Sequence, residues 1–317
     1  MPTLSAAKSS NAGYNPAYLP VAVIFGGTSG IGQAMTEILA AYLKGRVHIV
    51  IVARNKVAAD NIIASLPKAA ESKYEFMACD VTLMKGVHAV CRELSERLPT
   101  INFLVLSAGV FSLSGREETE EGIDKKMASR YYSRWAIING LLPSLRKAKE
   151  AGEDASVLTI LGAGMGPDVD LEDLGLKKGY SGLKAMGQTI SYNDLMIAVC
   201  ASDSFRHISL TESIQEYAKR EPEIAFTHIY PGTVATPALR PSSWLLTILM
   251  LPLRPILWLI STKPEDCAEY MLFALLNAEK GMNRRNAKGD DIGTKGFPQA
   301  DDGQQRVWDH SVQLTTV

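Results

Sequence analysis

Short apolar runs alternate along the chain with longer stretches in which apolar and polar residues recur at helical spacing. The runs are rich in Val, Ile and Leu and close at a turn or a glycine, which is typical of parallel strands buried on both faces. Strands are predicted at Val21–Gly26, His48–Ala53, Tyr74–Cys79, Phe103–Ser107, Ser156–Leu161 and Ala225–Tyr230, and helices near 30–43, 56–65, 83–97, 119–149, 180–200 and 264–278. This alternation predicts an α/β fold, a single doubly wound parallel sheet with helices on both faces.

Two segments depart from the alternation. Residues 1–18 are polar and interrupted by Pro and Gly, so we expect an N-terminal surface arm ahead of one domain over residues 19–317, with no signal peptide. Residues 244–260 hold 13 apolar residues in 17, but Arg254 and two prolines fall inside the run, which disfavours a membrane-spanning helix. Peripheral membrane contact and a small apolar lid over a substrate, at about residues 237–262, are the remaining interpretations.

Composition and charge exclude several classes of protein. Lys and Arg number 33 against 34 Asp and Glu, and 46% of the residues are hydrophobic. A nucleic-acid coat or a polybasic membrane binder needs a large charge imbalance, and a disordered chain has fewer apolar residues. The four cysteines lie far apart without a Cys-x-x-Cys pair, so neither a disulfide framework nor a zinc site is indicated and a reduced, cytoplasmic setting is expected.

A glycine-rich turn follows the first predicted strand and precedes a helical stretch. It reads Gly26-Gly27-Thr28-Ser29-Gly30-Ile31-Gly32. Glycines let the backbone turn tightly and approach an anion closely, while the helix N-terminus offers free N–H groups and the positive end of its dipole. The spacing alone is a weak signal. The strand before it and the helix after it favour a dinucleotide phosphate site over a tight turn that binds nothing.

This turn resembles the fingerprint of the short-chain dehydrogenase/reductase family, although Phe25 stands where the family has Thr. Further family motifs follow in order, and the resemblance covers roughly residues 19–280. It implies a Rossmann-type fold and a nicotinamide dinucleotide. The residues expected to hold the dinucleotide are Gly26, Thr28, Ser29, Gly30, Ile31 and Gly32 in the turn, Asp80 and Val81 at the adenine, Ser107, Ala108 and Gly109 after the fourth strand, and Pro231, Gly232, Val234 and Thr236 after the sixth.

The end of the second strand bears on the choice of cofactor. It reads Val52-Ala53-Arg54-Asn55, with no acidic residue between His48 and Ala59. A cation at this place suits the 2′-phosphate of NADP, whereas an acid would hold the free ribose hydroxyls of NAD. Arg54 and Asn55 therefore favour NADP(H), and the alternative for Arg54 is a solvated side chain at a strand end.

Catalysis in this family uses a Tyr as acid–base and a Lys four residues later that lowers its pKa and holds the ribose. Tyr180 and Lys184 resemble that pair, follow the fifth predicted strand and open a helix, where positions i and i+4 share one face. A nearby ammonium favours the phenolate of a tyrosine whose ordinary pKa is about 10. A competing alignment shifted by six places Met186 and Ile190 there, which would leave no acid–base pair.

Two other family positions depart from the pattern. The Ser that orients a carbonyl is replaced by Gly162, and Arg130 stands in the Asn position. Loss of one oriented donor costs about 10²–10³ in rate where such stabilisation is used. Arg130 has two interpretations: it faces solvent, or it points inward and its charge further favours the phenolate of Tyr180.

The leading hypothesis is an NADPH-dependent oxidoreductase that reduces ketones or oxidises alcohols on a bulky hydrophobic substrate and forms a homo-oligomer. The chain is similar to fungal secondary-metabolism members of the family. The alternative is an NADP(H)-binding protein with a degenerate site that acts as a non-redox cyclase or isomerase, a scaffold or a regulator. No metal site is indicated, because the acids between residues 163 and 179 have no His beside them and a solvated turn explains them.

Overall fold

The six predicted apolar runs form all but one strand of a seven-stranded parallel sheet. The computed structural model describes residues 2–201, 221–236, 261–298 and 302–316. Its strand order is β3-β2-β1-β4-β5-β6-β7, and the chain reverses direction across the sheet between β1 and β4. The strands are β1 (Val21–Phe25), β2 (His48–Ala53), β3 (Lys73–Ala78), β4 (Phe103–Leu106), β5 (Ser156–Ile160), β6 (Ala225–Ile229) and β7 (Gly281–Arg285). The doubly wound α/β sheet expected from the alternation is confirmed.

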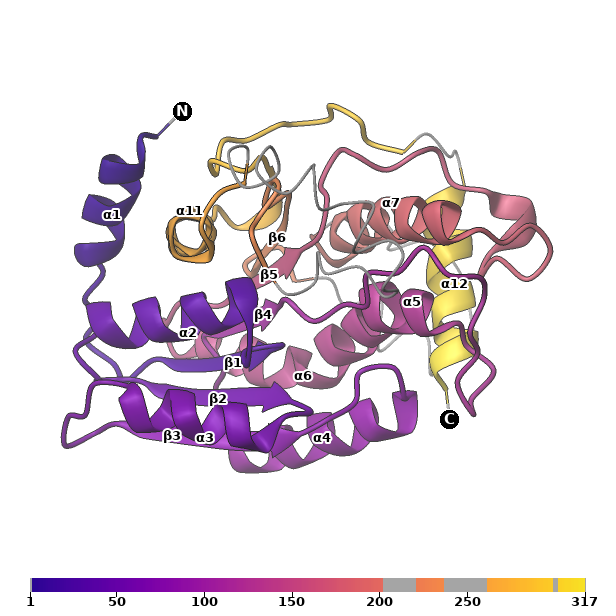
Figure 1. Cartoon of the computed structure of the whole chain (residues 1–317). Helices are drawn as coiled ribbons and strands as arrows, with labels where there is room; N and C mark the ends of the chain where they lie inside the picture. The colour runs from indigo at the N-terminus through magenta and orange to yellow at the C-terminus, as the bar shows by residue number, and fades with distance from the viewer. Residues whose placement is uncertain (1, 202–220, 237–260, 299–301, 317) are drawn as a thin grey trace, which may run out of the picture.

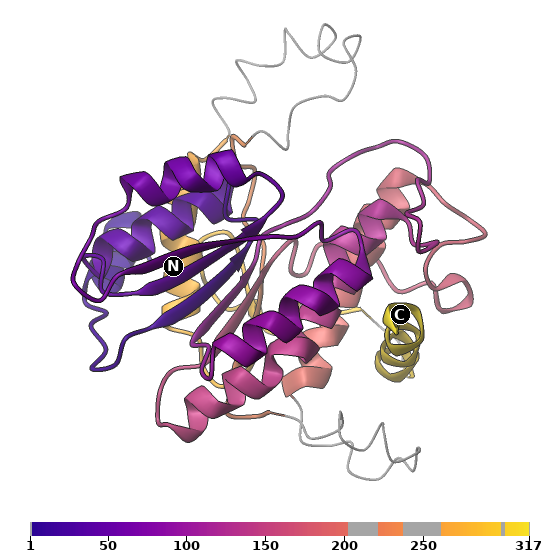
Figure 2. The ribbon, with the colours of Figure 1, turned by 90° about the horizontal axis from the view of Figure 1, so that it is seen from below.

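Helices cover both faces of the sheet (Figure 1). The α-helices described are α1 (Leu4–Ala12), α2 (Gly30–Tyr42), α3 (Lys56–Ser65), α4 (Met84–Arg97), α5 (Lys125–Met127), α6 (Ser133–Glu150), α7 (Gly182–Ala201), α11 (Pro264–Leu276) and α12 (Gly303–Thr315). A π-helical turn η1 (Ala128–Tyr132) joins α5 to α6, and a 3-10 turn η2 (Leu171–Asp173) precedes α7. Seen from below, the sheet separates the indigo and orange helices from the magenta and salmon ones (Figure 2).

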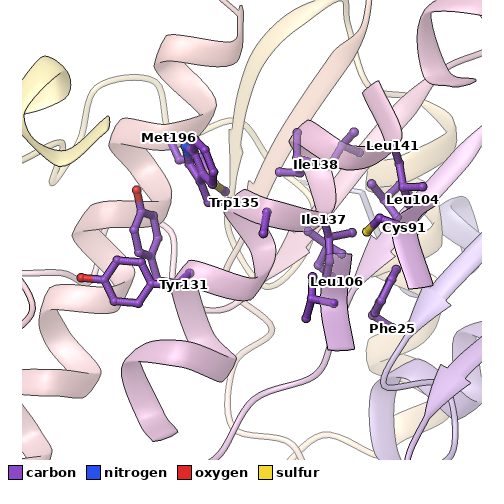
Figure 3. Close-up of a cluster of buried hydrophobic side chains, with 14 of the residues drawn as sticks. Phe25, Cys91, Leu104, Leu106, Tyr131, Trp135, Ile137, Ile138, Leu141 and Met196 are labelled. Carbon is purple, nitrogen blue, oxygen red and sulfur yellow. The ribbon is translucent and has the colours of Figure 1, made fainter. Parts of the chain in front are cut away.

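The core is divided in two by the pleat of the strands, because successive side chains point to opposite faces. In β1, Ala22 and Ile24 pack with the helices α2, α3 and α11, whereas Val23 and Phe25 pack with α4, α6 and α7. Figure 3 shows part of the second cluster, in which Phe25 lies near Leu106. Both faces of the inner strands β1, β2, β4, β5 and β6 are therefore buried, as their continuous apolar sequence predicts.

Three elements escape the hydrophobic pattern. The strand β7 reads Gly-Met-Asn-Arg-Arg. Its polar side chains Asn283 and Arg284 are buried, and hydrogen bonds compensate for their lost contact with water. The helix α12 lies in a stretch that appears polar and packs against α7 and α6. Within the N-terminal arm, α1 docks on α11 through Ala7 and Asn11, both fully buried.

The long helix expected near 119–149 is broken at its start. Asp124 caps α5, since its Oδ1 accepts hydrogen bonds from the N–H groups of Lys126 and Met127 at 3.0 and 3.1 Å. The π-helical turn η1 then places Ser129 and Arg130 one after the other before α6 begins. A π-turn changes which side chains face a neighbour, and such turns are frequent at functional sites.

The apolar segment near 237–262 was expected to form a lid or a membrane contact, and residues 237–260 lie outside the described part of the chain. The described residues just before and just after residues 237–260 lie side by side, because Val234 forms a parallel bridge with Thr262. Within the described residues, no helix combines the length and the apolar content needed to cross a membrane.

Candidate active site

One cavity of about 410 Å³ opens at the carboxyl ends of β1 to β4. Ligands of doubly wound sheets bind at this edge, where the strand order reverses. The cavity collects residues from loops that are far apart in the sequence. Those predicted for the cofactor are Gly26, Thr28, Ser29, Gly30, Ile31, Arg54, Asn55, Asp80, Val81, Ser107, Ala108, Gly109 and Thr236, and those not predicted are Val52, Ala53, Cys79, Thr82, Val110 and Ser129.

The glycines of the first turn meet steric demands that other residues would not. Gly26 has φ of 88°, and a Cβ there would lie 2.6 Å from the backbone nitrogen of Ala108. A Cβ on Gly32 would lie 2.4 Å from the carbonyl oxygen of Gly26, so Gly32 shapes the turn although it does not line the cavity. Ser29 is the N-cap of α2 with no side-chain capping bond, which leaves its hydroxyl and the first N–H groups of the helix for an anion.

The far end of the cavity is formed by β2 and β3. Asp80 Oδ1 accepts from the N–H and hydroxyl of Thr82 at 2.9 and 2.8 Å, and Asp80 Oδ2 lies 4.0 Å from Arg54 Nη1. The side-chain oxygen of Asn55 caps α3 by accepting from the N–H of Ala58 at 3.0 Å. The side chain of Arg54 is 71% exposed, so its guanidinium is loosely held and available to an anionic ligand.

The turn after β6 reaches the cavity through one residue. Thr236 lines the cavity beside Gly30, where an added Cβ would lie 3.0 Å from Thr236 Cγ2. Pro231, Gly232 and Val234 do not line it. They shape the turn that places Thr236, since Gly232 has φ of 76° and the carbonyl of Val234 accepts from the N–H of Thr236 at 2.8 Å.

Tyr180 and Lys184 are not among the residues that line the cavity. The helix α7 begins at Gly182, so Tyr180 precedes the helix and the pair does not share a helical face as expected. Lys184 Nζ instead donates to Asp170 Oδ2 at 2.8 Å. The structure therefore does not bring the ammonium of Lys184 to the tyrosine.

The hydroxyl of Tyr180 is enclosed and makes no hydrogen bond of normal geometry. Two cations face its ring, with Lys126 Nζ at 5.5 Å and Arg116 Cζ at 5.9 Å from the centroid. Burial, and after it the Asp124 carboxylate, raise the pKa of Tyr180 above its ordinary value. A phenol in this state is a weaker acid than free tyrosine, which is the opposite of what an acid–base tyrosine requires at neutral pH.

Other residues of α7 face the end of β5. A Cβ on Gly162 would lie 2.8 Å from Ile190 Cδ1, and Arg130 Nε donates to Thr189 Oγ1 at 3.2 Å. Met186, one turn before Ile190, is buried. This arrangement agrees with the competing alignment, in which Met186 and Ile190 occupy the positions of the Tyr and the Lys.

Arg130 points inward and is 9% exposed. The expected effect on Tyr180 is absent, because Arg130 is not among the groups that shift the pKa of that tyrosine. Beside it, Arg134 joins the ends of β4 and β5 by donating to the carbonyl oxygens of Ala108 and Ile160, both at 3.0 Å. The residue types gave no signal for this role of Arg134, because it depends on the position of η1 and α6 across the sheet.

A second buried network holds the loop that follows β5. Arg284 Nη2 donates to Asp194 Oδ2 at 2.8 Å, and His228 Nδ1 lies 2.7 Å from Asp194 Oδ1. The N–H of Gly162 donates to His228 Nε2 at 3.1 Å, which fixes the imidazole as neutral with its proton on Nδ1. The network therefore fixes the backbone at Gly162 and Gly164, whose N–H donates to Asp194 Oδ2 at 3.2 Å.

Comparison with known proteins shows which family the chain resembles. The family model described as short chain dehydrogenase matches residues 20–160, a range that contains most of the cavity-lining residues. A protein named as an oxidoreductase from Emericella nidulans is 33% identical over 237 residues, which are 74% of this chain and 65% of that protein. The chain is a relative of the short-chain dehydrogenases over residues 20–160, the range that the family model matches. The chain matches just under two thirds of the length of that fungal relative.

Two further proteins widen the comparison. A polyprenol dehydrogenase from Mus musculus is 25% identical over 315 residues, 95% of this chain and 87% of that protein. A solved 3-ketoacyl-(acyl-carrier-protein) reductase from Brucella melitensis, complexed with NADH, superposes with a TM-score of 0.57 at 18% identity, over 87% of this chain and 98% of that chain. The latter likeness concerns the fold alone. The predicted fold and the predicted resemblance to fungal short-chain dehydrogenases are confirmed.

The candidate site thus divides into two parts. The loops expected to hold a dinucleotide meet around one cavity, and its unpredicted lining residues, apart from Ser129, are sequence neighbours of predicted ones at the strand ends. Arg130 lies beside the lining residue Gly109, and Arg130 and Gly162 are the residues that the resemblance aligns with the family's Asn and Ser.

Proposed function

We propose that the protein binds NADP(H) in this cavity and is an oxidoreductase that exchanges a hydride between the nicotinamide and a bulky hydrophobic substrate. The supporting observation is that residues from the turns after β1, β2, β3, β4 and β6 line one cavity. Gly26 and Gly30 leave the space for a phosphate that a Cβ would fill. The nicotinamide supplies the hydride when it is bound, and the chain supplies binding and orientation.

The preference for NADP(H) rests on Arg54. Among the described residues that line the cavity it is the one Lys or Arg, and β2 ends without an acid that would take the ribose hydroxyls. A guanidinium presents a planar set of donors that suits a phosphate. Asp80 lies 4.0 Å from Arg54 Nη1, close enough to orient Arg54 but too far for a bidentate pair.

A hydrophobic substrate is supported by the surface beside the cavity. Phe111 and Leu113 directly follow the lining residue Val110 and are 50% and 59% exposed, and Leu183 is 70% exposed. A Cβ on Gly182 would touch the backbone of Leu113, so Leu183 lies next to this segment. The mouse relative is named for a long apolar alcohol. Cytoplasmic location, homo-oligomer formation, membrane contact and a role in fungal secondary metabolism stay predictions.

The enclosure of Tyr180 favours a second candidate function, an NADP(H)-binding protein without redox turnover. Its hydroxyl is enclosed and faces the Asp124 carboxylate, and Gly162 offers no hydroxyl in place of the family's Ser. The acid–base assignment to Tyr180 and Lys184 requires this enclosed hydroxyl to become accessible to the substrate. The two candidates share the cofactor and differ in turnover.

Cofactor binding tests what the two candidates share. We expect NADPH to quench the protein fluorescence with a lower dissociation constant than NADH. Arg54→Ala should raise the dissociation constant of NADPH by about tenfold and leave that of NADH nearly unchanged, because a charge-assisted bond contributes about 1.5–3 kcal/mol when buried and less at an exposed site. Arg92→Ala, at an exposed arginine on α4, is the matched control. Equal affinity of the wild type for both cofactors would contradict the preference.

Turnover separates the candidates. NADPH oxidation is followed with a panel of apolar ketones for the wild type, Tyr180→Phe and Tyr192→Phe. Tyr192→Phe is the control, because it removes another enclosed tyrosine hydroxyl. If Tyr180 is the acid, its loss lowers kcat by about 10²–10⁴, the contribution of a general acid, and Tyr192→Phe does not. Turnover that survives Tyr180→Phe removes this tyrosine from the mechanism, and binding without any turnover favours the second candidate.

A further inference from the structure

Arg130 is a nearly buried cation without a carboxylate partner. Its Nε donates to Thr189 Oγ1, and neither Nη atom makes a hydrogen bond or an ion pair among the described residues. The Nη atoms are also absent from the fully enclosed polar atoms that lack a partner, whereas Nε of Arg134 is one of these. The end of its guanidinium is therefore not fully enclosed, although Arg130 is not itself among the residues that line the cavity.

The neighbouring cation, Arg134, adds to the electrostatic free energy that opposes folding of the unliganded protein. Arg134 is 2% exposed, and its partners are the neutral oxygens of Thr159, Ala108 and Ile160. Burial lowers the pKa of Arg130 to about 10 and that of Arg134 to about 9, so both remain charged at neutral pH. Two adjacent buried charges with neutral partners destabilise the unliganded protein, since a buried ion needs a counter-ion to recover its lost hydration.

The position of Arg130 joins this charge to the proposed site. Ser129, the preceding residue, lines the cavity, and a Cβ on the lining residue Gly109 would lie 3.4 Å from Arg130 Cγ. This is the end of the cavity formed by β4, which lies two strands away from Arg54 on β2. A 2′-phosphate expected at Arg54 therefore does not neutralise Arg130.

The surroundings of Arg130 define the rest of the ligand. Ile190 follows Thr189 on α7 and meets Gly162, neither Ile190 nor Gly162 carries a charge, and Phe111 and Leu113 continue the exposed apolar residues after Val110. A ligand that fits both features has an anionic oxygen group at one end and an apolar body. A neutral ketone or alcohol leaves the guanidinium without a counter-ion.

We propose that Arg130 is a specificity-determining residue that binds a carboxylate on the substrate, so that the protein acts on an apolar carboxylic acid. The proposal deepens the proposed function, because it concerns the substrate of the same cavity and rests on that function. A bidentate pair between a guanidinium and a carboxylate provides orientation as well as binding. In this role Arg130 replaces the neutral amide of the family with a fixed charge.

The experiment compares one apolar chain with three head groups. Decanoate, methyl decanoate and 1-decanol are titrated calorimetrically into the protein saturated with NADP⁺, below their micelle-forming concentrations. We expect decanoate to bind the wild type at least tenfold more tightly than the other two. Arg130→Met should remove this preference, and Arg130→Lys should keep part of it, because Lys retains the charge and loses the bidentate geometry. Arg92→Met, at an exposed arginine, is the control and should bind as the wild type.

Thermal unfolding distinguishes this role from a structural one, because replacing an arginine that stabilises the fold would lower the Tm. Arg130→Met should raise the Tm, because it removes a buried charge that has no counter-ion. Equal binding of the three head groups by the wild type, no decanoate binding, or a decanoate preference that survives Arg130→Met would each overturn the proposal. A large loss of NADPH affinity in Arg130→Met would assign the anion to the cofactor and also overturn it. If the wild type does not bind NADPH, the proposed function fails, and this result is distinct from the four outcomes that overturn the role of Arg130.

Discussion

Arg284 is held inside the protein by one carboxylate. It is 1% exposed, and its Nε and Nη2 donate to the two oxygens of Asp194 at 2.9 and 2.8 Å. We predict that Arg284→Met lowers the free energy of unfolding by about 3–5 kcal/mol, the usual cost of leaving one member of a buried ion pair alone. Urea denaturation measures it, with Arg92→Met as an exposed control. A loss below about 1 kcal/mol would mean that the pair does not support the fold.

The same network predicts a pH dependence. Burial lowers the pKa of His228 below 6.5, whereas an unfolded histidine takes up its proton near 6.5. The unfolded state therefore binds more protons just below this pH, and stability should fall as the pH drops from 7.5 to 5.5, by up to about 1.4 kcal/mol per pH unit for one proton. Protonation of Nε2 would also break the bond from the N–H of Gly162.

The control for this prediction is His228→Gln. Two other described histidines, His48 and His310, also have pKa values lowered first by burial, so the variant should retain some pH dependence. We expect its urea midpoint to change less between pH 7.5 and 5.5 than that of the wild type. Parallel pH curves for the two proteins would count against a buried neutral His228.

Individual site residues differ in how far the sequence can predict them. Gly26 could be predicted because its requirement is local: a positive φ and a close approach of the backbone to an anion. Asp194, His228 and Arg284 could not, because their meaning arises only when α7, β6 and β7 come together. For Tyr180 the local spacing predicts the acid–base residue but carries no information on the enclosure of its hydroxyl, which depends on residues elsewhere in the chain.

At the scale of elements, α12 completes the core that α6 and α7 leave open. Trp308 packs edge-on against Trp135 with ring centroids 5.4 Å apart, and Ser311 bonds the hydroxyl of Tyr131 at 2.7 Å. We predict that Trp308→Ala costs about 3–5 kcal/mol of unfolding free energy, as other large-to-small changes at buried aromatics do. Gln313→Ala, on the exposed side of the same helix, should cost little. Urea denaturation of both variants tests the docking of α12.

The strand β7 and the helix α12 were not predicted from the sequence, and one physical reason explains both. Periodicity detects apolar faces, so it predicted the six strands that are buried by apolar packing. The strand β7 is buried through hydrogen bonds of Asn283 and Arg284, and α12 buries few apolar residues, among them Val307 and Trp308. Burial of this kind depends on partners elsewhere in the chain and leaves no local pattern.

At the scale of the whole molecule, a bound dinucleotide should act as a clamp on the sheet. The cavity joins residues from five turns, so a ligand there stabilises the folded state only when all of them are in place. NADPH at 100 times its dissociation constant should add about 2.7 kcal/mol of stability and raise the Tm by several degrees. Gly26→Ala should abolish the rise, because its Cβ would lie 2.6 Å from the nitrogen of Ala108.

The contrary result is a Tm that NADPH leaves unchanged in the wild type. It would show that the cavity does not bind this dinucleotide at the concentration used. A rise of equal size in Gly26→Ala would show instead that the glycine turn is not where the ligand binds.

Gly162 has a consequence for how the reacting half of the site can change. A serine there would place its Cβ 2.8 Å from Ile190 Cδ1, so Ile190 must shift or shrink before a hydroxyl fits. Shrinking Ile190 first opens a void against a bare glycine, and adding the serine first crowds the helix. Each order passes through a less stable intermediate. A hydroxyl at this place therefore calls for coupled changes at Gly162 and Ile190, which arise less readily than a single substitution.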